Sequence, residues 1–530
     1  MKKQSFAKGA IILAVCSIVA KGLGGIYRIG LTSVLGGEGI GYYQLVFPFF
    51  SLILALIANG LPITVSKLVS GELALSNKGA VKTLMKSALA YALIAGLVGG
   101  VFTIAISRLL AGAQSTVGVY ICYVAIAPAI VFVTLAGVFK GWFLGSGNMT
   151  TAGISQVVEV VTKLALGFVI ASYFLRLGTI QAVAGGLLAV SISEFAGFLF
   201  VFLMYLKEKK EYKNILPQKV DFKFFSTLLP ISLSGLVFPI VAFIDSITIV
   251  NLLEFGGDAA GVKHYGLLTG PVNSLINMPI VFSMSVAVAI VPAIASAMTN
   301  YDVVSVKHKT AMSIKVCFLL AFPFFAGSAF LSSQLVNVLY PSLTTSDKNL
   351  TSTLMSVAAI NIVLLSLLEV FDAVLMGLNR TKPVLINVAV GGGIKILIQI
   401  LFVPRFGIMV CAFATIIFYL VSMLLNATLY NNLVGKNSNL IKSISKILLS
   451  GAIMSIIVLM TAFIKNDILA LLLGAVSGGV AYIVCLVVSR AVEKEEMMML
   501  PFGKHIIRFL QRTKLLKEKS HYDKDGSTRL

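Results

Sequence analysis

Long apolar stretches, separated by short polar connections, recur along the whole 530-residue chain. A helix that crosses the hydrocarbon layer of a bilayer needs about 20 consecutive, mostly apolar residues, because each residue adds only about 1.5 Å of length. This pattern predicts an all-α integral membrane protein with about fourteen transmembrane helices, at residues 9–34, 41–65, 82–107, 117–139, 152–175, 180–206, 225–253, 265–297, 311–337, 350–376, 383–403, 407–430, 444–464 and 467–489.

The composition supports a membrane protein over a soluble one. Hydrophobic residues make up 58% of the chain and charged residues 12%, whereas soluble domains carry roughly 45–50% apolar and about 25% charged residues. The five cysteines all lie inside apolar stretches, without the C-x-x-C spacing of metal ligands, so they are interpreted as small core residues.

Basic residues decide the predicted orientation. The net charge is +21, and the basic residues sit in short connections and at both ends of the chain, which favours contact with anionic lipid over nucleic acid. With the N-terminus inside, the inner segments carry most of the lysines and arginines. The outer segments carry only Arg108, Arg176, Lys263, Lys348, Arg405 and Lys465. Both termini are therefore predicted to be cytoplasmic.

Several local patterns recur at an offset of about 230 residues. Leu61-Pro62 is matched by Val291-Pro292, and Lys163 by Lys395. Six helices return the chain to the same side of the membrane, so the offset predicts two parallel repeats. The predicted domains are an N-lobe (1–206), a cytoplasmic linker (207–223), a C-lobe (224–430), two further helices (431–490) and a basic cytoplasmic tail (491–530).

Two cations lie inside the first predicted helix. Lys21 and Arg28 are seven residues apart, which is two helical turns, so both point to one side. An ionisable group in hydrocarbon costs several kcal/mol and usually faces protein or a wet cavity. The intervening glycines at 22, 24 and 25 would let a ligand approach closely. One interpretation is a site for a phosphate or pyrophosphate, and the other is that both side chains reach the membrane boundary.

Other ionisable residues lie within predicted spans. Glu159 and Lys163 have the i, i+4 spacing of an intrahelical ion pair, and the other interpretation is that they bind the substrate in the cavity. In the second half of the chain, two interpretations remain for a set of intramembrane charges. One is structural ion pairs and the other is a site for a coupling cation, and the residues are Asp245, Glu369, Asp372 and Lys395. The chain lacks a catalytic motif, a histidine metal motif and an ATP-binding loop. We therefore expect neither an enzyme nor a bound cofactor or metal.

Four segments resemble a known family. They are Lys21 to Gly24 with Arg28, Gly36 to Tyr43, Gly60 to Lys67, and Lys140 to Glu159. These segments resemble the polysaccharide-transport branch of the MATE-like (MOP) flippase superfamily, and within it the stage V sporulation protein B group, which is related to the MurJ-type lipid II flippases.

The resemblance implies two six-helix lobes in a V around a central cavity, plus two extra C-terminal helices that line a groove for a polyprenyl tail. It maps the family's cationic cavity residues onto Lys21 and Arg28. A further basic residue in helix eight has only Lys263 or His264 as a match. A sodium site between helices seven and eleven would use Asp245 and Asn387, but glycine stands at 391 where a second acid is expected.

Together these features lead to the expectation of a flippase for lipid-linked cell-wall precursors in a bacterial plasma membrane, with Na⁺ or H⁺ as candidate coupling ions. Cell-wall or spore-cortex synthesis proteins are candidate partners. One alternative is a cation-coupled multidrug exporter of the same fold, whose cavity should be acidic. Another is a non-transporting scaffold of a cell-wall synthesis complex, which would need no buried charges.

Overall fold

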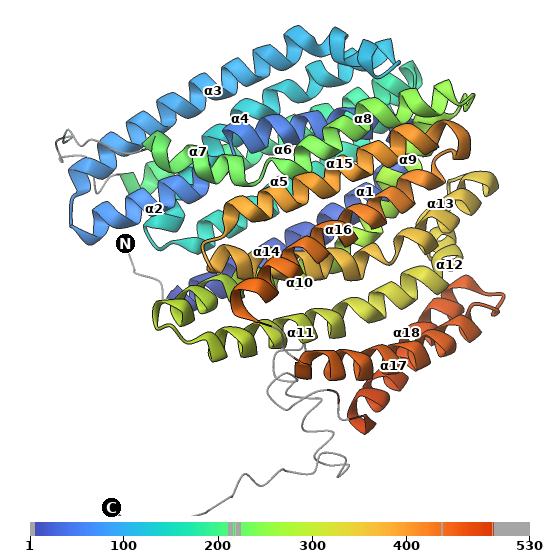
Figure 1. Cartoon of the computed structure of the whole chain (residues 1–530). Coiled ribbons are helices and arrows are strands. Elements are labelled where there is room, and N and C mark those ends of the chain that lie inside the picture. The colour runs from blue at the N-terminus through green and yellow to red at the C-terminus, as the bar shows by residue number, and fades with distance from the viewer. Residues whose placement is uncertain are drawn as a thin grey trace, which may run out of the picture.

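The computed structural model describes residues 6–209, 216, 218, 224–435, 438–489 and 491. These residues form helices joined by short turns, with no strand among them (Figure 1). The prediction of an all-α protein is confirmed. Most of the predicted linker 207–223 and nearly all of the predicted tail 491–530 lie outside the described residues.

The first six helices follow one another through short connections. Their bounds are α1 (Phe6–Ile57), α2 (Leu61–Ala74), α3 (Lys78–Ala113), α4 (Tyr120–Gly145), α5 (Met149–Phe174) and α6 (Thr179–Glu208). Short 3-10 turns, η1 (Val117–Val119) and η2 (Leu175–Leu177), precede α4 and follow α5.

The remaining helices are α7 (Phe224–Ser234), α8 (Val237–Phe255), α9 (Gly261–Leu267), α10 (Asn273–Thr299), α11 (Val303–Phe330), α12 (Ser332–Leu339), α13 (Thr345–Ala358), α14 (Asn361–Gly377), α15 (Thr381–Phe406), α16 (Met409–Val434), α17 (Ser438–Thr461) and α18 (Asp467–Val488). A π-helical turn, η4 (Leu268–Val272), joins α9 to α10.

The chain is a multi-pass membrane protein. Among the described residues, twelve helices are long and apolar enough to cross a bilayer, and the pair α13 and α14, bent by 41°, makes a thirteenth. One of the twelve, Ile11–Ala74, has 64 residues, which is more than twice the length needed for one crossing. The predicted count of fourteen spans stays a prediction.

The first two predicted spans are two helical arms of α1 that meet at Gly36 and fold back on each other, because Arg28 of the first arm lies 5.7 Å from the Phe47 ring of the second. The residues on both sides of Gly36 are helical, but Gly36 itself has φ 68° and ψ −176°, which ends one helical arm and begins the next. Glycine adopts this conformation without the steric cost that a Cβ would bring. The sharp turn at Gly36 therefore lies within the connection expected between residues 34 and 41.

The predicted span 225–253 is broken into α7 and α8 by a turn at Gly235. Phe224 and Leu228 of α7 belong to a core formed with α2, α3, α4 and α6, whereas α8 packs mainly on α1 and α15. The two halves of this span are thus held by different parts of the molecule. The predicted span 265–297, by contrast, lies within one unbroken helical stretch, Gly261–Thr299, which includes the π-helical turn η4 with Pro271.

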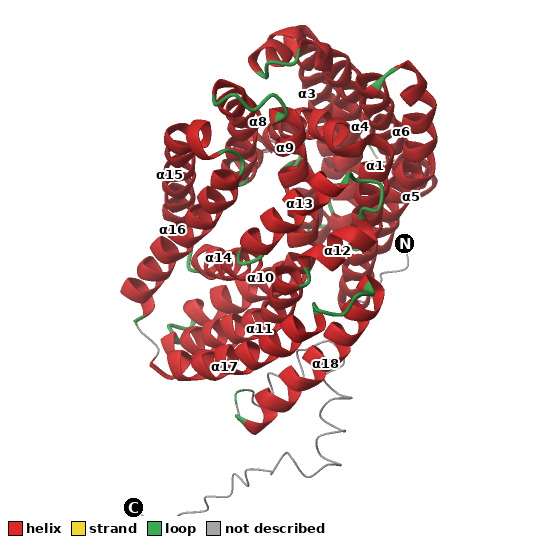
Figure 2. Cartoon of the chain, turned by 90° about the vertical axis from the view of Figure 1, so that its right-hand side faces the viewer, coloured by secondary structure: helices red, strands yellow, loops and turns green. Residues whose placement is uncertain are grey.

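Two groups of helices meet along α1. Helices α1 to α6 share two hydrophobic cores, and helices α8 to α16 share a third, large core. Helices α17 and α18 pack on α11 and α12 through a separate core, at one side of the second group (Figure 2). This arrangement agrees with two lobes plus two extra C-terminal helices.

Candidate functional site

A cavity of about 1460 Å³ lies between the two lobes. One wall comes from α1 and α5, and the facing wall comes from α10, α11 and α14, with α17 and α18 completing the lining. Its size exceeds the usual 300–1,000 Å³ of a small-molecule pocket. The cavity can therefore hold a large ligand that touches both lobes.

Both cations of the first helix line this cavity. The Lys21 Nζ atom lies 3.5 Å from Met284 Sδ, and Arg28 Nη1 donates a hydrogen bond of 3.3 Å to Ser274 Oγ. The Arg28 guanidinium also lies 5.7 Å from the centroid of the Phe47 ring. Neither cation forms an ion pair with a carboxylate of the described residues. Their charges are thus available to an anionic ligand.

The glycines between these cations leave space beside the helix backbone. Gly22 and Gly24 line the cavity, and a Cβ added at either position would have no atom within 4 Å. A ligand can therefore approach the α1 backbone closely between Lys21 and Arg28.

The predicted pair of Glu159 and Lys163 does not form, although both residues line the cavity. Glu159 Oε1 instead accepts an ion pair of 2.6 Å from Lys140 Nζ of α4. Lys163 Nζ lies 5.6 Å from the centroid of the Tyr27 ring. Spacing along one helix allowed the first pairing, but a side chain from a neighbouring helix competes more closely for the carboxylate. Lys163 thus adds a third cation to the wall formed by α1 and α5.

The facing wall is mostly apolar and sulfur-rich. It includes side chains of α10 and α11, and it continues onto α17 and α18. Representative lining residues are Met278, Phe282, Phe324, Met454 and Leu471. The cavity therefore presents cations on one side and a hydrocarbon-like surface on the other.

Of the two acids predicted on α14, Glu369 lines the cavity and Asp372 does not. Lys21 is within electrostatic range of Glu369 across the cavity. Asp372 Oδ1 accepts a hydrogen bond from Asn426, whose Oδ1 accepts one of 2.7 Å from Asn387. The two acids thus have different surroundings despite their spacing of one turn.

Asp245 and Lys395 form a buried ion pair, with Lys395 Nζ 2.5 Å from Asp245 Oδ2. Neither residue lines the cavity. The predicted sodium ligands Asp245 and Asn387 share no hydrogen bond among the described residues, and Lys395 provides the positive charge beside Asp245. This geometry favours the structural ion pair over the sodium site that the resemblance suggested.

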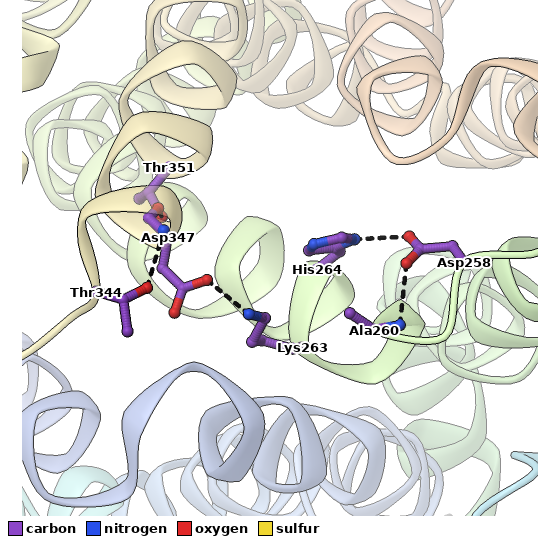
Figure 3. Close-up of polar contacts among 7 residues, drawn as sticks. All are labelled: Asp258, Ala260, Lys263, His264, Thr344, Asp347 and Thr351. Carbon is purple, nitrogen blue, oxygen red and sulfur yellow. Dashed lines mark hydrogen bonds and ion pairs between the residues drawn. The ribbon is translucent and has the colours of Figure 1, made fainter.

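Lys263 and His264, the two candidates for the basic residue expected in helix eight, lie on α9 (Figure 3). Neither lines the cavity. Lys263 Nζ is 2.8 Å from Asp347 Oδ1 of α13, and His264 Nδ1 is 2.6 Å from Asp258 Oδ2. Both side chains therefore have local acidic partners, and neither joins Lys21 and Arg28.

The lobes meet at one end of the molecule, around the second arm of α1. A Cβ at Gly41 would lie 2.3 Å from the Val262 carbonyl oxygen, and one at Gly266 would lie 2.4 Å from the Gly41 backbone. Gln44 Nε2 also donates a 2.6 Å hydrogen bond to the Thr269 carbonyl oxygen. We call this contact between α1 and α9 the glycine seam.

A second set of contacts joins the lobes between α3 and α8. Asn251 Nδ2 donates to the Ala113 carbonyl oxygen at 2.7 Å, and Ser115 Oγ donates to Asn251 Oδ1 at 2.5 Å. Gln114 Nε2 donates to Ser246 Oγ at 3.2 Å. The lobes are thus closed at this end, while the cavity separates them beside Lys21 and Arg28.

No group of three or more histidine, cysteine, aspartate and glutamate residues could hold a metal ion in the part of the chain that the structure describes. Lys140 and Glu194 were not predicted as site residues. Both lie within electrostatic range of Glu159, and Glu194 lies within range of Lys163. The position of Glu194 inside a predicted span was the one signal in the sequence, whereas its neighbours come from other helices and no spacing within one helix could have indicated them.

A family model described as polysaccharide biosynthesis protein matches residues 6–298, which is more than half of the chain. Stage V sporulation protein B of Bacillus subtilis (strain 168) is 27% identical over 96% of this chain and 100% of that protein. Lipid II flippase MurJ of the same organism is 22% identical over 90% of this chain and 94% of that protein.

A solved structure of lipid II flippase MurJ, in an inward closed conformation, superposes with a TM-score of 0.67. It covers 90% of this chain and 98% of that chain at 17% sequence identity. The fold is therefore that of the MurJ structure. These similarities confirm the resemblance found in the sequence, and they agree with the prediction that the chain is not an enzyme.

Proposed function

The chain belongs to the polysaccharide biosynthesis protein family, and from this premise we propose that it is a flippase for an undecaprenyl-pyrophosphate-linked cell-wall precursor. The cargo is lipid II or a similar polysaccharide intermediate, moved from the inner to the outer leaflet of a bacterial plasma membrane. The observation that carries the proposal is the position of Lys21, Arg28 and Lys163 on one wall of an interlobe cavity.

The two walls of the cavity match the two parts of such a cargo. A pyrophosphate group interacts favourably with lysine and arginine, since charge-assisted hydrogen bonds are the strong ones. A polyprenyl chain has no polar atoms and fits the apolar surface that extends from Met278 to Met454 and Leu471. The open backbone at Gly22 and Gly24 gives the head group room between the cations.

Alternating access explains how the cargo would cross. The glycine seam closes one end of the lobes, and the cavity lies beside the first arm of α1. With the N-terminus cytoplasmic, as the distribution of basic residues predicts, the cavity is reached from the inner leaflet. Release outside then requires the seam to separate while the lobes approach each other at the other end.

The membrane potential favours outward movement of an anion when the cell interior is negative. Each elementary charge that crosses the full potential is worth about 2.3 kcal/mol per 100 mV. The three cations stay with the protein, so the charge that moves is set by the head group and by any coupling ion. Lys21, Arg28 and Lys163 therefore lower the cost of desolvating the head group without carrying charge across themselves.

The test is a reconstituted assay with the purified protein in liposomes. Lipid II placed in one leaflet is made accessible to an outside enzyme only when it is flipped. Wild-type protein should raise the rate of exposure above that of protein-free vesicles, and proteins with Lys21→Ala or Arg28→Ala should lose most of the increase. Normal flipping by both variants would overturn the proposal.

A cation-coupled drug exporter is the second candidate, and Glu369 is the observation that favours it. This carboxylate lines the cavity, where an organic cation would find a counter-charge. The three cations on the opposite wall weigh against that cargo, because they repel it. Unchanged drug resistance in a deletion strain, together with flipping of lipid II by the purified protein, would exclude the exporter.

A further inference from the structure

Four charged side chains from three helices of the N-terminal lobe form a cluster at the edge of the cavity. We call Lys140, Glu159, Lys163 and Glu194 the charge quartet. Lys140 is on α4, Glu159 and Lys163 are on α5, and Glu194 is on α6. Two acids and two bases sum to zero charge, so the quartet is neutral while all four are ionised.

The packing of α5 on α6 brings the two carboxylates together. The Glu159 side chain lies against Gly197, where an added Cβ would be 2.2 Å from Glu159 Cγ and 2.3 Å from Oε1. Gly197 is three residues after Glu194, and positions three apart share one face of a helix. The Glu159 carboxylate is therefore held on the face of α6 that carries Glu194.

The two acids differ in their partners. Glu159 has the 2.6 Å ion pair with Lys140. Glu194 has no hydrogen bond and no ion pair among the residues described, and it interacts only at longer range with Glu159, Lys140 and Lys163. A carboxylate that lacks a close partner and lies beside a second carboxylate is the member of the cluster that binds a proton most readily.

We propose that Glu194 is a proton-binding site whose occupancy controls how strongly the cavity attracts an anion. When a proton from the aqueous phase binds the Glu194 carboxylate, the quartet changes from neutral to a charge of +1. Lys163, which lines the cavity, is then left without a compensating acid, because Glu159 is held by Lys140. The proton therefore adds one effective positive charge to the wall that carries Arg28.

A proton fits this position better than a metal cation does. Lys140 and Lys163 flank the two carboxylates and would repel a sodium ion, whereas a proton neutralises one oxygen without needing further ligands. The charged and titratable groups that face Glu194 from α4 and α5 are those of the quartet. From α1, Tyr27 and Arg28 lie close to Lys163.

The linkage is reciprocal. If a proton on Glu194 strengthens anion binding, an anion in the cavity strengthens proton binding by the same factor. One linked proton changes the affinity by up to about tenfold per pH unit. This inference rests on the proposed function, since it assigns the anion to the cavity that the flippase would use.

The experiment measures binding of farnesyl pyrophosphate to the purified full-length protein from mildly acidic to mildly alkaline pH. The probe has its own titration, so each variant is compared with wild type on the same probe. Glu194→Gln keeps the shape of the side chain and mimics the protonated state. It should bind tightly at every pH and lose most of the pH dependence, whereas Glu254→Gln, on the exposed end of α8, should behave as wild type.

A second variant distinguishes loss of the proton site from a folding defect. Glu159→Gln removes the neighbouring negative charge and frees Lys140, both of which favour the ionised form of Glu194. The pH dependence should therefore move to lower pH and not disappear. Replacing sodium chloride with choline chloride should leave all curves unchanged. A wild-type pH slope in Glu194→Gln, or a sodium-dependent slope, would overturn the inference.

An infrared titration separates this inference from the proposed function. A protonated-carboxyl band that is present in wild type and absent in Glu194→Gln would locate the proton without any ligand. If that band is found but farnesyl pyrophosphate does not bind, the proposed function fails. If the probe binds but the band is unaffected by Glu194→Gln, the proton site fails while the function stands.

Discussion

The ammonium group of Lys395 contacts the carboxylate of Asp245 at 2.5 Å, inside the C-terminal lobe and away from the cavity. The two residues belong to α15 and α8, so the pair ties one helix to another. Both side chains are about nine-tenths buried, with 9% and 11% of their surface exposed. Breaking such a pair leaves a buried charge without compensation.

We therefore expect single replacements of this pair to destabilise the fold. Lys395→Met and Asp245→Asn should each cost about 3–5 kcal/mol of stability, because the remaining partner stays buried and charged or loses its donor. The double variant should be more stable than the less stable single variant. Thermal unfolding in detergent measures both effects. Singly substituted proteins that unfold like wild type but no longer flip would instead indicate a coupling site.

The cationic wall gives a prediction on transport. Lys21→Ala and Arg28→Ala should each reduce the flipping rate by about tenfold or more, since a charge-assisted contact contributes about 1.5–3 kcal/mol. Lys21 is exposed to the cavity and Arg28 is partly exposed, so the unfolding temperature should change little. Arg28→Lys should retain part of the activity. Equal loss in a matched surface variant, Lys348→Ala, would contradict a specific role for these cations.

The open space beside α1 gives a prediction on size. Gly24→Leu puts a bulky side chain into the cavity at a position where an added Cβ has no protein atom within 4 Å. The variant should fold normally and flip lipid II several-fold more slowly, because the head group loses room. Gly393→Leu is the control, since Gly393 also has no atom within 4 Å of an added Cβ and does not line the cavity. Equal flipping rates in the two variants would argue against a head group at this position.

Separation of the lobes can be tested by cross-linking. Ser115, in the turn after α3, and Asn251 of α8 join the two lobes, so a pair of cysteines at these positions should block flipping when linked by a short thiol reagent. A reductant should restore transport if a cleavable reagent is used. Cysteines at Lys263 and Asp347 join α9 to α13 within one lobe, and linking them should leave transport unchanged. Full activity of the first linked pair would exclude separation at this end.

The helices themselves follow from the sequence. Apolar runs long enough to cross a bilayer predict most of the spans, and the seven-residue spacing predicts that Lys21 and Arg28 share a face. Both features depend on residues that are close along the chain. The structure adds the finding that this face lines a cavity.

Partners on different helices could not be predicted in the same way. Glu159 pairs with Lys140 across helices although Lys163 stands at the ideal spacing within α5. Lys395 pairs with Asp245 from α8, and not with either acid of α14. Which of several suitably charged residues makes the contact depends on how helices pack, and the periodicity of a single helix carries no information on that packing.

Irregular backbone was also hard to predict. The break between α7 and α8 comes just before Pro239, which lies in the first turn of α8, where a missing N–H costs nothing. Proline is also compatible with a continuous helix, as Pro128 inside α4 shows. Packing of α7 against α2 and α3, and of α8 against α15, decides between the two outcomes.

Gly36 connects two helical arms of α1 that have different roles. The arm before it carries Lys21 and Arg28, and the arm after it carries Gly41 and Gln44 of the glycine seam. A cargo that binds Lys21 and Arg28 therefore contacts a helical arm that is connected through Gly36 alone to the arm of the glycine seam. The flexibility of this one glycine therefore sets how far a movement of the cavity wall reaches the contact between the lobes.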